Sequence, residues 1–510
     1  MSTASTDILG HPRGLVILFF TEMWERFSFY GMKALLIFYL TRQLMFGQGE
    51  ALLILGSYLA LVYVTPVLGG YIADRYLGFR RAIWFGGILI MCGHLGLALE
   101  GVEASISPDG TVSRNEIALQ AFYFSLALIV AGTGLLKSSI SSIVGSLYEE
   151  TDPRRDGGFS IFYMGINFGA FIAPLLCGWL GETYGWSWGF GAAAVGMLAG
   201  LMVFKAGAAW LDGRGEPANI EALNQTVSGP LKRGHCVYIG CLAAVLPFWL
   251  LVQSGEIVGT LLTIVGLCLV VVVIVYAVRA LESVDRDRVF AILALLPAST
   301  IFWMFFEQTG GSIALFAEKG VDLNVLGIQF LPSQIQSINP LMIITLAPVF
   351  GWLWVALQKR GRDISLPVKF SLGLVQLGIG FYMLFLGVSS ATANEPVALI
   401  WLVLAYLFHT TGELTLSPIG LSAVTKLSID KILGLMMGIW FLANGFANYF
   451  ASRVAIAAGL DAKPGEAATL EESLPVFGNL FESIAFAAVV AGVVMFIVSP
   501  FIRRLMHGVK

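Results

Sequence analysis

The sequence predicts an all-α polytopic membrane protein, in which helices cross the bilayer many times. Of the 510 residues, 57% are hydrophobic and only 12% are charged, and the mean hydropathy is +0.82. A soluble domain usually carries about 25% charged residues. Apolar segments long enough to cross a bilayer recur along the whole chain. Because the five cysteines lie in apolar runs, we interpret them as packing residues rather than as a disulfide framework.

Fourteen of the apolar segments are candidate membrane-spanning helices. They cover residues 14–43, 50–76, 81–100, 118–147, 158–181, 187–211, 234–254, 257–280, 289–316, 332–358, 366–390, 397–427, 432–458 and 478–502. If the N-terminus is cytoplasmic, 22 of the 30 lysines and arginines fall in cytoplasmic loops and tails. Positive charge accumulates on the cytoplasmic side of membrane proteins, so we expect both termini to be cytoplasmic.

A short pattern recurs between the two halves of the chain. Pro66-Val-Leu-Gly and Pro348-Val-Phe-Gly each lead into a basic loop. Coincidence is the alternative, because Pro-x-x-Gly is common in membrane helices. Two halves of the same topology predict the major facilitator fold, with six-helix bundles at residues 14–211 and 287–505. Residues 212–286 are then a polar linker and an inserted helix pair.

Ionisable residues inside apolar segments are costly, at about 2.5–3.5 kcal/mol each near mid-membrane. The set in this chain is Arg26, Lys33, Lys137, Glu22, Glu25, Glu307 and Glu413. At about 100° per residue, Glu22, Arg26 and Lys33 fall on one face of the first helix, which therefore cannot face lipid. Three positive charges against four negative ones approach the balance that buried charges require.

Two interpretations of these charges are open. They are structural ion pairs that lock helices together, or they form a substrate and proton site. Replacing buried ion pairs by apolar residues is often neutral or stabilising, so stability alone explains their presence poorly. A buried glutamate takes up a proton more readily when a substrate anion removes its neighbouring cation, and this exchange couples proton movement to substrate movement.

Seven motifs occur along the chain in a fixed order. Two of them are Glu22-x-x-Glu25-Arg26 and Phe162-Tyr163-Met-Gly-Ile-Asn167-Phe-Gly169. The others are Gly-Thr-Gly-Leu-Leu-Lys137, Phe-Glu307-Gln, Ser337-Ile-Asn339-Pro340, Gly412-Glu413-x-x-x-Ser417-Pro418 and Gly438-x-Trp440-Phe441. Together they resemble the proton-dependent oligopeptide transporter family over almost the whole chain, and the inserted helix pair resembles its fourteen-helix bacterial members.

The resemblance implies a role for each matching residue. Proton coupling would rest on Glu22, Glu25, Arg26, Lys137 and Glu307. Peptide binding would involve Tyr30, Lys33, Tyr63, Lys137, Asn167, Trp303, Asn339, Glu413, Ser417 and Trp440. Glu413 would receive the peptide ammonium group, and the peptide carboxylate would bind near Lys33 and Lys137. Cations at one end and a carboxylate at the other recognise any short peptide by its ends, while aromatic walls tolerate varied side chains.

Three positions depart from the family pattern. Lys33 stands where many relatives carry arginine, and a lysine cannot clamp a carboxylate bidentately. Phe29 lacks the hydroxyl that some relatives have, and Gly56 occupies a position where mammalian members carry a histidine. Among the remaining residues, we interpret His94 and His409 as hydrogen-bonded packing residues, with a proton role as the alternative.

We therefore expect a proton-coupled symporter for di- and tripeptides in a bacterial inner (plasma) membrane. Its partners would be the peptide, protons and the lipid bilayer, with no catalytic residue, metal, further cofactor or nucleic acid, and its oligomeric state stays open. The closest alternative is the same fold carrying nitrate, an amino-acid derivative or a drug, although Glu413 favours a substrate with a cationic group. A membrane enzyme is a second alternative, but the sequence offers neither a metal-ligand cluster nor a nucleophile paired with a base. A receptor with an inactive site is the third alternative.

Overall fold

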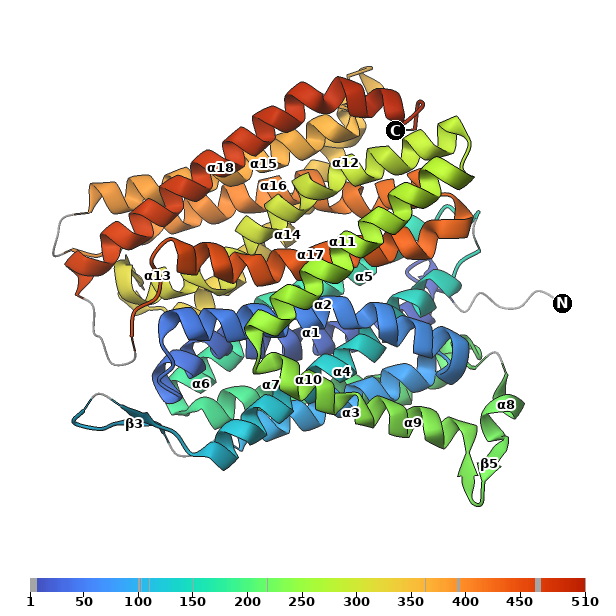
Figure 1. Cartoon of the computed structure of the whole chain (residues 1–510), viewed down its shortest axis with the longest axis horizontal. Coiled ribbons are helices and arrows are strands. Elements are labelled where there is room, and N and C mark those ends of the chain that lie inside the picture. Colours follow the sequence, from blue (N-terminus) through green and yellow to red (C-terminus); the bar gives the residue numbers. More distant parts are fainter. Residues whose placement is uncertain are drawn as a thin grey trace. The chain divides into compact units, whose positions relative to one another are not determined.

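The computed structural model is almost entirely helical (Figure 1). It describes residues 7–99, 101, 103–109, 111–149, 151–217, 219–362, 364–391, 395–463 and 469–509, without the side chains of residues 417–419, 421, 422 and 430. The chain divides into two compact units. Unit 1 comprises Met1–Met45 and Leu61–Ser254, and unit 2 comprises Phe46–Ala60 and Gly255–Lys510.

Unit 1 is built mainly around its first helix. Its helices are α1 (Gly14–Phe38), the second half of α2 (Gln48–Ile72), α3 (Phe79–Ala98), α4 (Glu116–Ser146), α5 (Arg155–Ala173), α6 (Trp179–Tyr184), α7 (Trp186–Ala206), α8 (Ile220–Asn224), α9 (Arg233–Ala243) and α10 (Val245–Val252). Helix α1 packs against α5 and α7, and α3 packs against α4 and α7. The charged helix is therefore surrounded by protein inside this unit.

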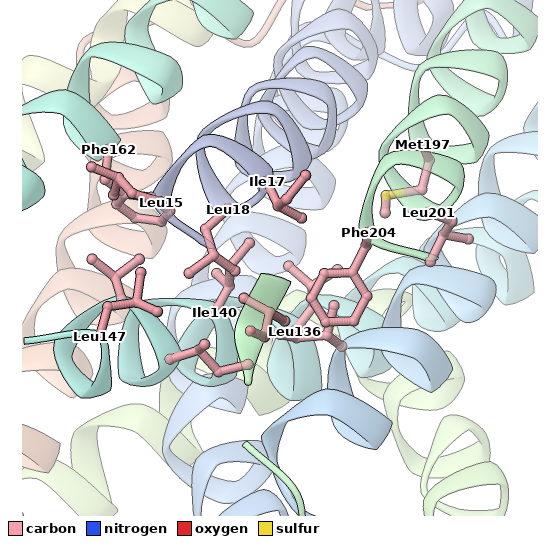
Figure 2. Close-up of a cluster of buried hydrophobic side chains, with 14 of the residues drawn as sticks. Leu15, Ile17, Leu18, Leu136, Ile140, Leu147, Phe162, Met197, Leu201 and Phe204 are labelled. Atoms are coloured by element: carbon pink, nitrogen blue, oxygen red, sulfur yellow. The ribbon is translucent and has the colours of Figure 1, made fainter. Parts of the chain in front are cut away.

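Apolar side chains from α1, α3, α4, α5 and α7 form the core at the start of α1 (Figure 2). Leu18 is fully buried, with Leu136 from α4 and Phe204 from α7 in the same cluster. Further along, α5 approaches α1 so closely that a Cβ added at Gly169 would lie 2.2 Å from the Met23 carbonyl oxygen. Large apolar residues at the start of α1 and a close glycine contact at Met23 thus fix the position of this helix.

Unit 2 contains the remaining helices. They are α11 (Gly255–Ala280), α12 (Ser283–Phe306), α13 (Ser312–Gly320), α14 (Ile338–Lys359), α15 (Leu366–Ser390), α16 (Leu399–Leu427), α17 (Leu433–Ala457) and α18 (Leu470–Leu505), with the first half of α2. Helix α15 packs against α16 and α18, and α12 packs against α17. The inserted helices belong to different units. Helix α10 packs on α4 in unit 1, whereas α11 packs on α17 in unit 2.

The described strands are short and lie in the connections. Four pairs are antiparallel, namely β1 (Asp7–Ile8) with β2 (His11–Pro12), β3 (Ser105–Ile106) with β4 (Val112–Ser113), β5 (Thr226–Ser228) with β6 (Leu231–Lys232) and β8 (Asn324–Val325) with β9 (Ile328–Gln329). The fifth pair is parallel and joins β7 (Val321–Asp322) to β10 (Val397–Ala398). These short strand pairs lie within loops, and they do not form a sheet that packs in the hydrophobic core.

Every predicted segment coincides with a helix. Among the described residues, twelve helical stretches are long and apolar enough to cross a membrane. Helices α1 and α17 coincide with the other two predicted segments, and each is 25 residues long. Most boundaries differ from the predicted ones by a few residues, and two differences are larger. Helix α18 begins at Leu470, where Thr469 and Glu472 form a capping box, and the segment predicted at 289–316 is interrupted by a 3-10 turn over Glu307–Gly310.

Candidate functional site

A compact ion cluster lies on α1 in unit 1. Glu22, Glu25 and Arg26 are only 3%, 1% and 4% exposed. Arg26 Nη2 donates to Glu25 Oε1 at 2.6 Å, and Arg26 Nε donates to the other oxygen of the same carboxylate. Arg26 Nε also lies 3.3 Å from Glu22 Oε1. One guanidinium therefore holds two buried carboxylates, which its planar fork of donors suits.

Lys137 joins this cluster from α4. Its ammonium acts electrostatically on Glu22 and lies 4.2 Å from the centroid of the Tyr63 ring on α2. Small residues bring the two helices together, since a Cβ added at Gly134 would lie 2.9 Å from the Thr65 Cβ. A cation over an aromatic face is attracted by the ring quadrupole. Two of the predicted cations, Arg26 and Lys137, thus act on the same carboxylate.

Aromatic rings accompany the other charges of α1. The Arg26 guanidinium lies 5.1 Å from the centroid of Phe29, and the Lys33 ammonium lies 5.9 Å from that of Tyr30. Lys33 is only 6% exposed. The guanidinium contact with Phe29 uses the ring face, so the missing hydroxyl at this position does not remove it.

Asn167 faces its own helix in this structure. It is 4% exposed, and its Nδ2 donates to the Tyr163 carbonyl oxygen one turn earlier on α5, at 2.9 Å. Its predicted role in peptide binding stays a prediction.

A carboxylate held by an amide lies in unit 2. Asn339 Nδ2 on α14 donates to Glu413 Oε2 on α16 at 2.9 Å and lies 3.0 Å from Thr410 Oγ1. Glu413 is 7% exposed. The predicted pairing of Asn339 with Glu413 is therefore present. Thr410 was not predicted as a site residue, although its position three residues before Glu413 puts it on the same helix face.

Glu307 opens the 3-10 turn between α12 and α13 and is 8% exposed. The next residue, Gln308, fastens this turn to α17, because its Nε2 donates to the Ala451 carbonyl oxygen at 2.7 Å. Ser312 Oγ donates to Gln308 Oε1 at 2.5 Å. Both polar atoms of Gln308 are therefore used to position the backbone that carries Glu307.

The predicted aromatic walls of unit 2 are well packed. Trp303 lies edge-on to Phe302 and Phe306, with ring centroids 5.5 Å and 5.3 Å away. Trp440 is 6% exposed, and a Cβ added at Gly420 would lie 2.7 Å from its Cζ2 atom. The Ser417 side chain lies outside the described residues.

The two buried histidines differ from the prediction. His94 and His409 are both fully buried, but neither ring nitrogen of either residue has a hydrogen-bond partner in the described part of the chain. The Phe381 ring lies 4.6 Å from His409, centroid to centroid. The packing role agrees with the structure, whereas no described residue makes the predicted hydrogen bonds; the neighbours of His409 include Gly380 and the rings of Phe306 and Phe381.

Many apolar helices with buried, mutually paired charges define a polytopic membrane transporter. The sequence model described as the POT family matches residues 80–460, and the chain belongs to that family. It is 37% identical to the peptide transporter YePEPT of Yersinia enterocolitica subsp. palearctica, over 98% of this chain and 96% of that protein. It is 34% identical to a di-/tripeptide transporter of Lactococcus lactis subsp. cremoris, over 100% of this chain and 99% of that protein.

Solved structures agree with this membership. A crystal structure of a mutant peptide transporter POT in complex with alafosfalin is similar with a TM-score of 0.80 and 39% identity, over 98% of this chain and 97% of that chain. POT transporters have the major facilitator fold, so the fold class predicted from the sequence is confirmed.

Proposed function

We propose that this chain imports di- and tripeptides together with protons, by alternating access, across a bacterial inner (plasma) membrane. Both termini would lie in the cytoplasm, as the distribution of lysine and arginine indicates. The observation that carries the proposal is the set of buried, mutually paired charges. It offers a carboxylate for a substrate ammonium group, cations for a substrate carboxylate, and further carboxylates for protons.

The ammonium end of the peptide would bind Glu413. Asn339 donates to one oxygen of this carboxylate at 2.9 Å, which helps to fix the orientation in which the carboxylate would meet the substrate. A buried carboxylate binds a primary ammonium group through charge-assisted hydrogen bonds, which are stronger than neutral ones. This preference separates a peptide from a simple anion such as nitrate.

The carboxylate end would bind near Lys33 and Lys137. Both ammonium groups lie against tyrosine rings, which limit the directions they can take. A lysine offers a point charge rather than a bidentate fork, so it tolerates several orientations of the substrate carboxylate. The walls formed by Tyr30, Tyr63, Trp303 and Trp440 would accept varied peptide side chains.

Proton coupling would follow from competition for cations. Arg26 holds Glu25 at two oxygens, whereas Glu22 depends on a longer contact with Arg26 and on Lys137. When a substrate carboxylate takes Lys137, Glu22 loses part of its counter-charge and accepts a proton more readily. Glu307 would be the second proton acceptor, in the C-terminal half, bridging to a first-helix cation in one state of the cycle.

The test is dialanine uptake into proteoliposomes, with and without an inward proton gradient. Nitrate, free alanine and an amino-acid derivative with both charged ends serve as competitors. Accumulation that depends on the gradient and is not blocked by any of these competitors supports the proposal. Uptake without a gradient dependence contradicts the coupling. Competition by nitrate contradicts the substrate class.

A further inference from the structure

A small cavity in unit 2 lies beside Glu307. Its walls come from the first half of α2, from the 3-10 turn that carries Glu307 and Gln308, and from α17, which contributes Asn448 and Ser452. About 10 Å³ of it is open to the centre of a water molecule. A cavity of this size holds about one water when its lining offers enough polar partners.

Most polar atoms around the cavity already have partners. Gln308 uses both of its polar atoms, and Ser452 Oγ donates to the Leu52 carbonyl oxygen at 2.6 Å. Asn448 Nδ2 donates to the Asn444 carbonyl oxygen at 2.9 Å. Asn448 Oδ1 is the exception, because no described residue donates a hydrogen bond to it although the side chain is only 3% exposed.

Glycine keeps this cavity narrow. A Cβ added at Gly56 would lie 2.2 Å from Ser452 Oγ and 3.1 Å from the Asn448 carbonyl oxygen, so α2 approaches α17 only because position 56 has no side chain. The close approach places the polar face of α17 against the turn that carries Glu307. Any occupant of the cavity is therefore a very small molecule with a hydrogen to donate.

We propose that one ordered water occupies this cavity and bridges the Glu307 carboxyl group to Asn448 Oδ1. Asn448 is then a positioning residue for proton transfer, and the inference rests on the proposed role of Glu307 in coupling. A buried amide oxygen without a donor is costly, and the water supplies that donor. With Glu307 ionised, the water donates to the carboxylate and to Asn448. With Glu307 protonated, the water accepts from its hydroxyl and donates to Asn448 and to Ser452 Oγ.

The same water delivers the proton. A hydronium ion formed at this site transfers one proton along the hydrogen bond to the Glu307 carboxylate, which leaves a neutral water and a neutral carboxylic acid. Charge and atoms balance without another reactant. Asn448 keeps the water in line throughout, because its oxygen accepts a hydrogen bond both before and after the transfer.

The test compares two variants at position 448 in proteoliposomes. Asn448→Leu keeps the branched shape at Cγ but is larger and has no acceptor, whereas Asn448→Ser keeps an acceptor and leaves room for the water. Asn444→Leu, one turn earlier on α17, is the matched control, because its residue contributes only a backbone carbonyl to Asn448. Gradient-driven dialanine uptake and counterflow exchange are measured for each.

We expect Asn448→Leu to lower gradient-driven uptake about tenfold while exchange continues, and Asn448→Ser to stay close to the parent. Unchanged driven uptake in Asn448→Leu, or an equal loss of uptake and exchange, overturns the inference. A high-resolution density map of the unaltered protein tests for the bridging water directly, and this test does not depend on how the variants fold. A water peak between Asn448 Oδ1 and the Glu307 carboxyl supports the inference, and ordered side chains without that peak overturn it.

Glu307→Gln separates this inference from the proposed function. If Glu307→Gln retains gradient-driven accumulation, Glu307 is not the coupling residue and both statements fail. If Glu307→Gln abolishes accumulation while Asn448→Leu behaves like the parent, the bridging water fails alone.

Discussion

Asn339 Nδ2 lies 2.9 Å from Glu413 Oε2, so an amide on α14 orients a buried carboxylate on α16. The same amide group lies 3.0 Å from Thr410 Oγ1 on α16. A single asparagine thus ties two helices together at the point where we propose that the peptide ammonium group binds. The charge belongs to Glu413 itself, whereas the orientation of its carboxylate depends on Asn339. The two contributions can therefore be tested by different substitutions.

Glu413→Gln keeps the shape of this side chain but removes its charge. We expect dialanine affinity to fall by about 10–100-fold, because a hydrogen bond to a charged group contributes about 1.5–3 kcal/mol. Asn339→Ala removes only the orienting amide and is expected to weaken affinity by about fivefold. Thr411→Val is the control, since the Thr411 hydroxyl donates only to the Phe408 carbonyl oxygen of its own helix. Peptide binding by purified protein measures all three, and unaltered affinity in Glu413→Gln would remove this residue from the site.

Arg26→Gln leaves two buried carboxylates without their shared guanidinium. Removing one partner of a buried ion pair typically costs about 3–5 kcal/mol, so the thermal unfolding temperature should drop clearly. Adding Glu25→Gln to the Arg26→Gln chain should recover part of that loss, because the uncompensated charge disappears. Neither variant should accumulate peptide against a gradient. A double variant that is less stable than the sum of the single changes would contradict the pairing described for α1.

Tyr63→Leu tests the ring beneath Lys137. The ammonium lies 4.2 Å from the ring centroid, and a cation–π contact contributes about 0.5–2 kcal/mol. We expect Tyr63→Leu to raise the Michaelis constant for dialanine several-fold, because Lys137 is less well positioned. Tyr63→Phe keeps the ring and is the control. An equal effect of both substitutions would assign the role to the tyrosine hydroxyl.

Gly169→Ala tests the close approach of α5 to α1. The added Cβ would lie 2.2 Å from the Met23 carbonyl oxygen, so we expect a destabilisation of about 1–3 kcal/mol. Gly191→Ala on α7 is the matched control, since its nearest neighbour would be the Ala98 Cβ at 4.0 Å. Alanine is about 1 kcal/mol better than glycine within a helix, so the control should unfold at the same or a higher temperature.

Asp152 gives a pH dependence outside the membrane. Hydrogen bonds from the Arg154 side chain and backbone lower the pKa of Asp152 below its ordinary value. Because the pKa in the folded state is below that in the unfolded state, the stabilisation is complete above the ordinary aspartate pKa of about 3.9 and is lost as the pH falls through the folded value. Thermal unfolding should therefore separate Asp152→Asn from the parent at neutral pH, and the two should converge at strongly acidic pH.

The ion cluster on α1 could be predicted from the sequence because it depends on one helix. Glu22 and Arg26 are four residues apart, so helical periodicity alone brings them to the same face. Asn339 and Glu413 come from different helices, and the sequence pointed to them only through motifs. Gln308, Thr410 and Asn448 were missed, because uncharged polar residues are common in membrane helices and only the packing shows which of them face a site.

The break in the segment predicted at 289–316 has a similar explanation. Its apolar run resumes after the short stretch Glu307-Gln-Thr-Gly-Gly-Ser312, so hydropathy averaged over the segment predicts one helix. The backbone instead forms a 3-10 turn before Gly311, which Gln308 fastens to α17. Hydrogen bonds to a distant helix decide this local conformation, and they cannot be read from the segment alone.

The connection that follows α7 is anchored to the start of α3. Arg80 Nη1 lies 2.8 Å from Glu216 Oε1, and the Arg80 amide donates to the Gly215 carbonyl oxygen at 2.9 Å. Gly78 leaves space for Pro217, whose nitrogen would lie 2.4 Å from an added Cβ. The chain therefore enters the linker from an anchored position within unit 1. The helices up to α7 are held in place before the chain reaches the inserted pair, so lengthening the linker after Pro217 should leave their packing undisturbed.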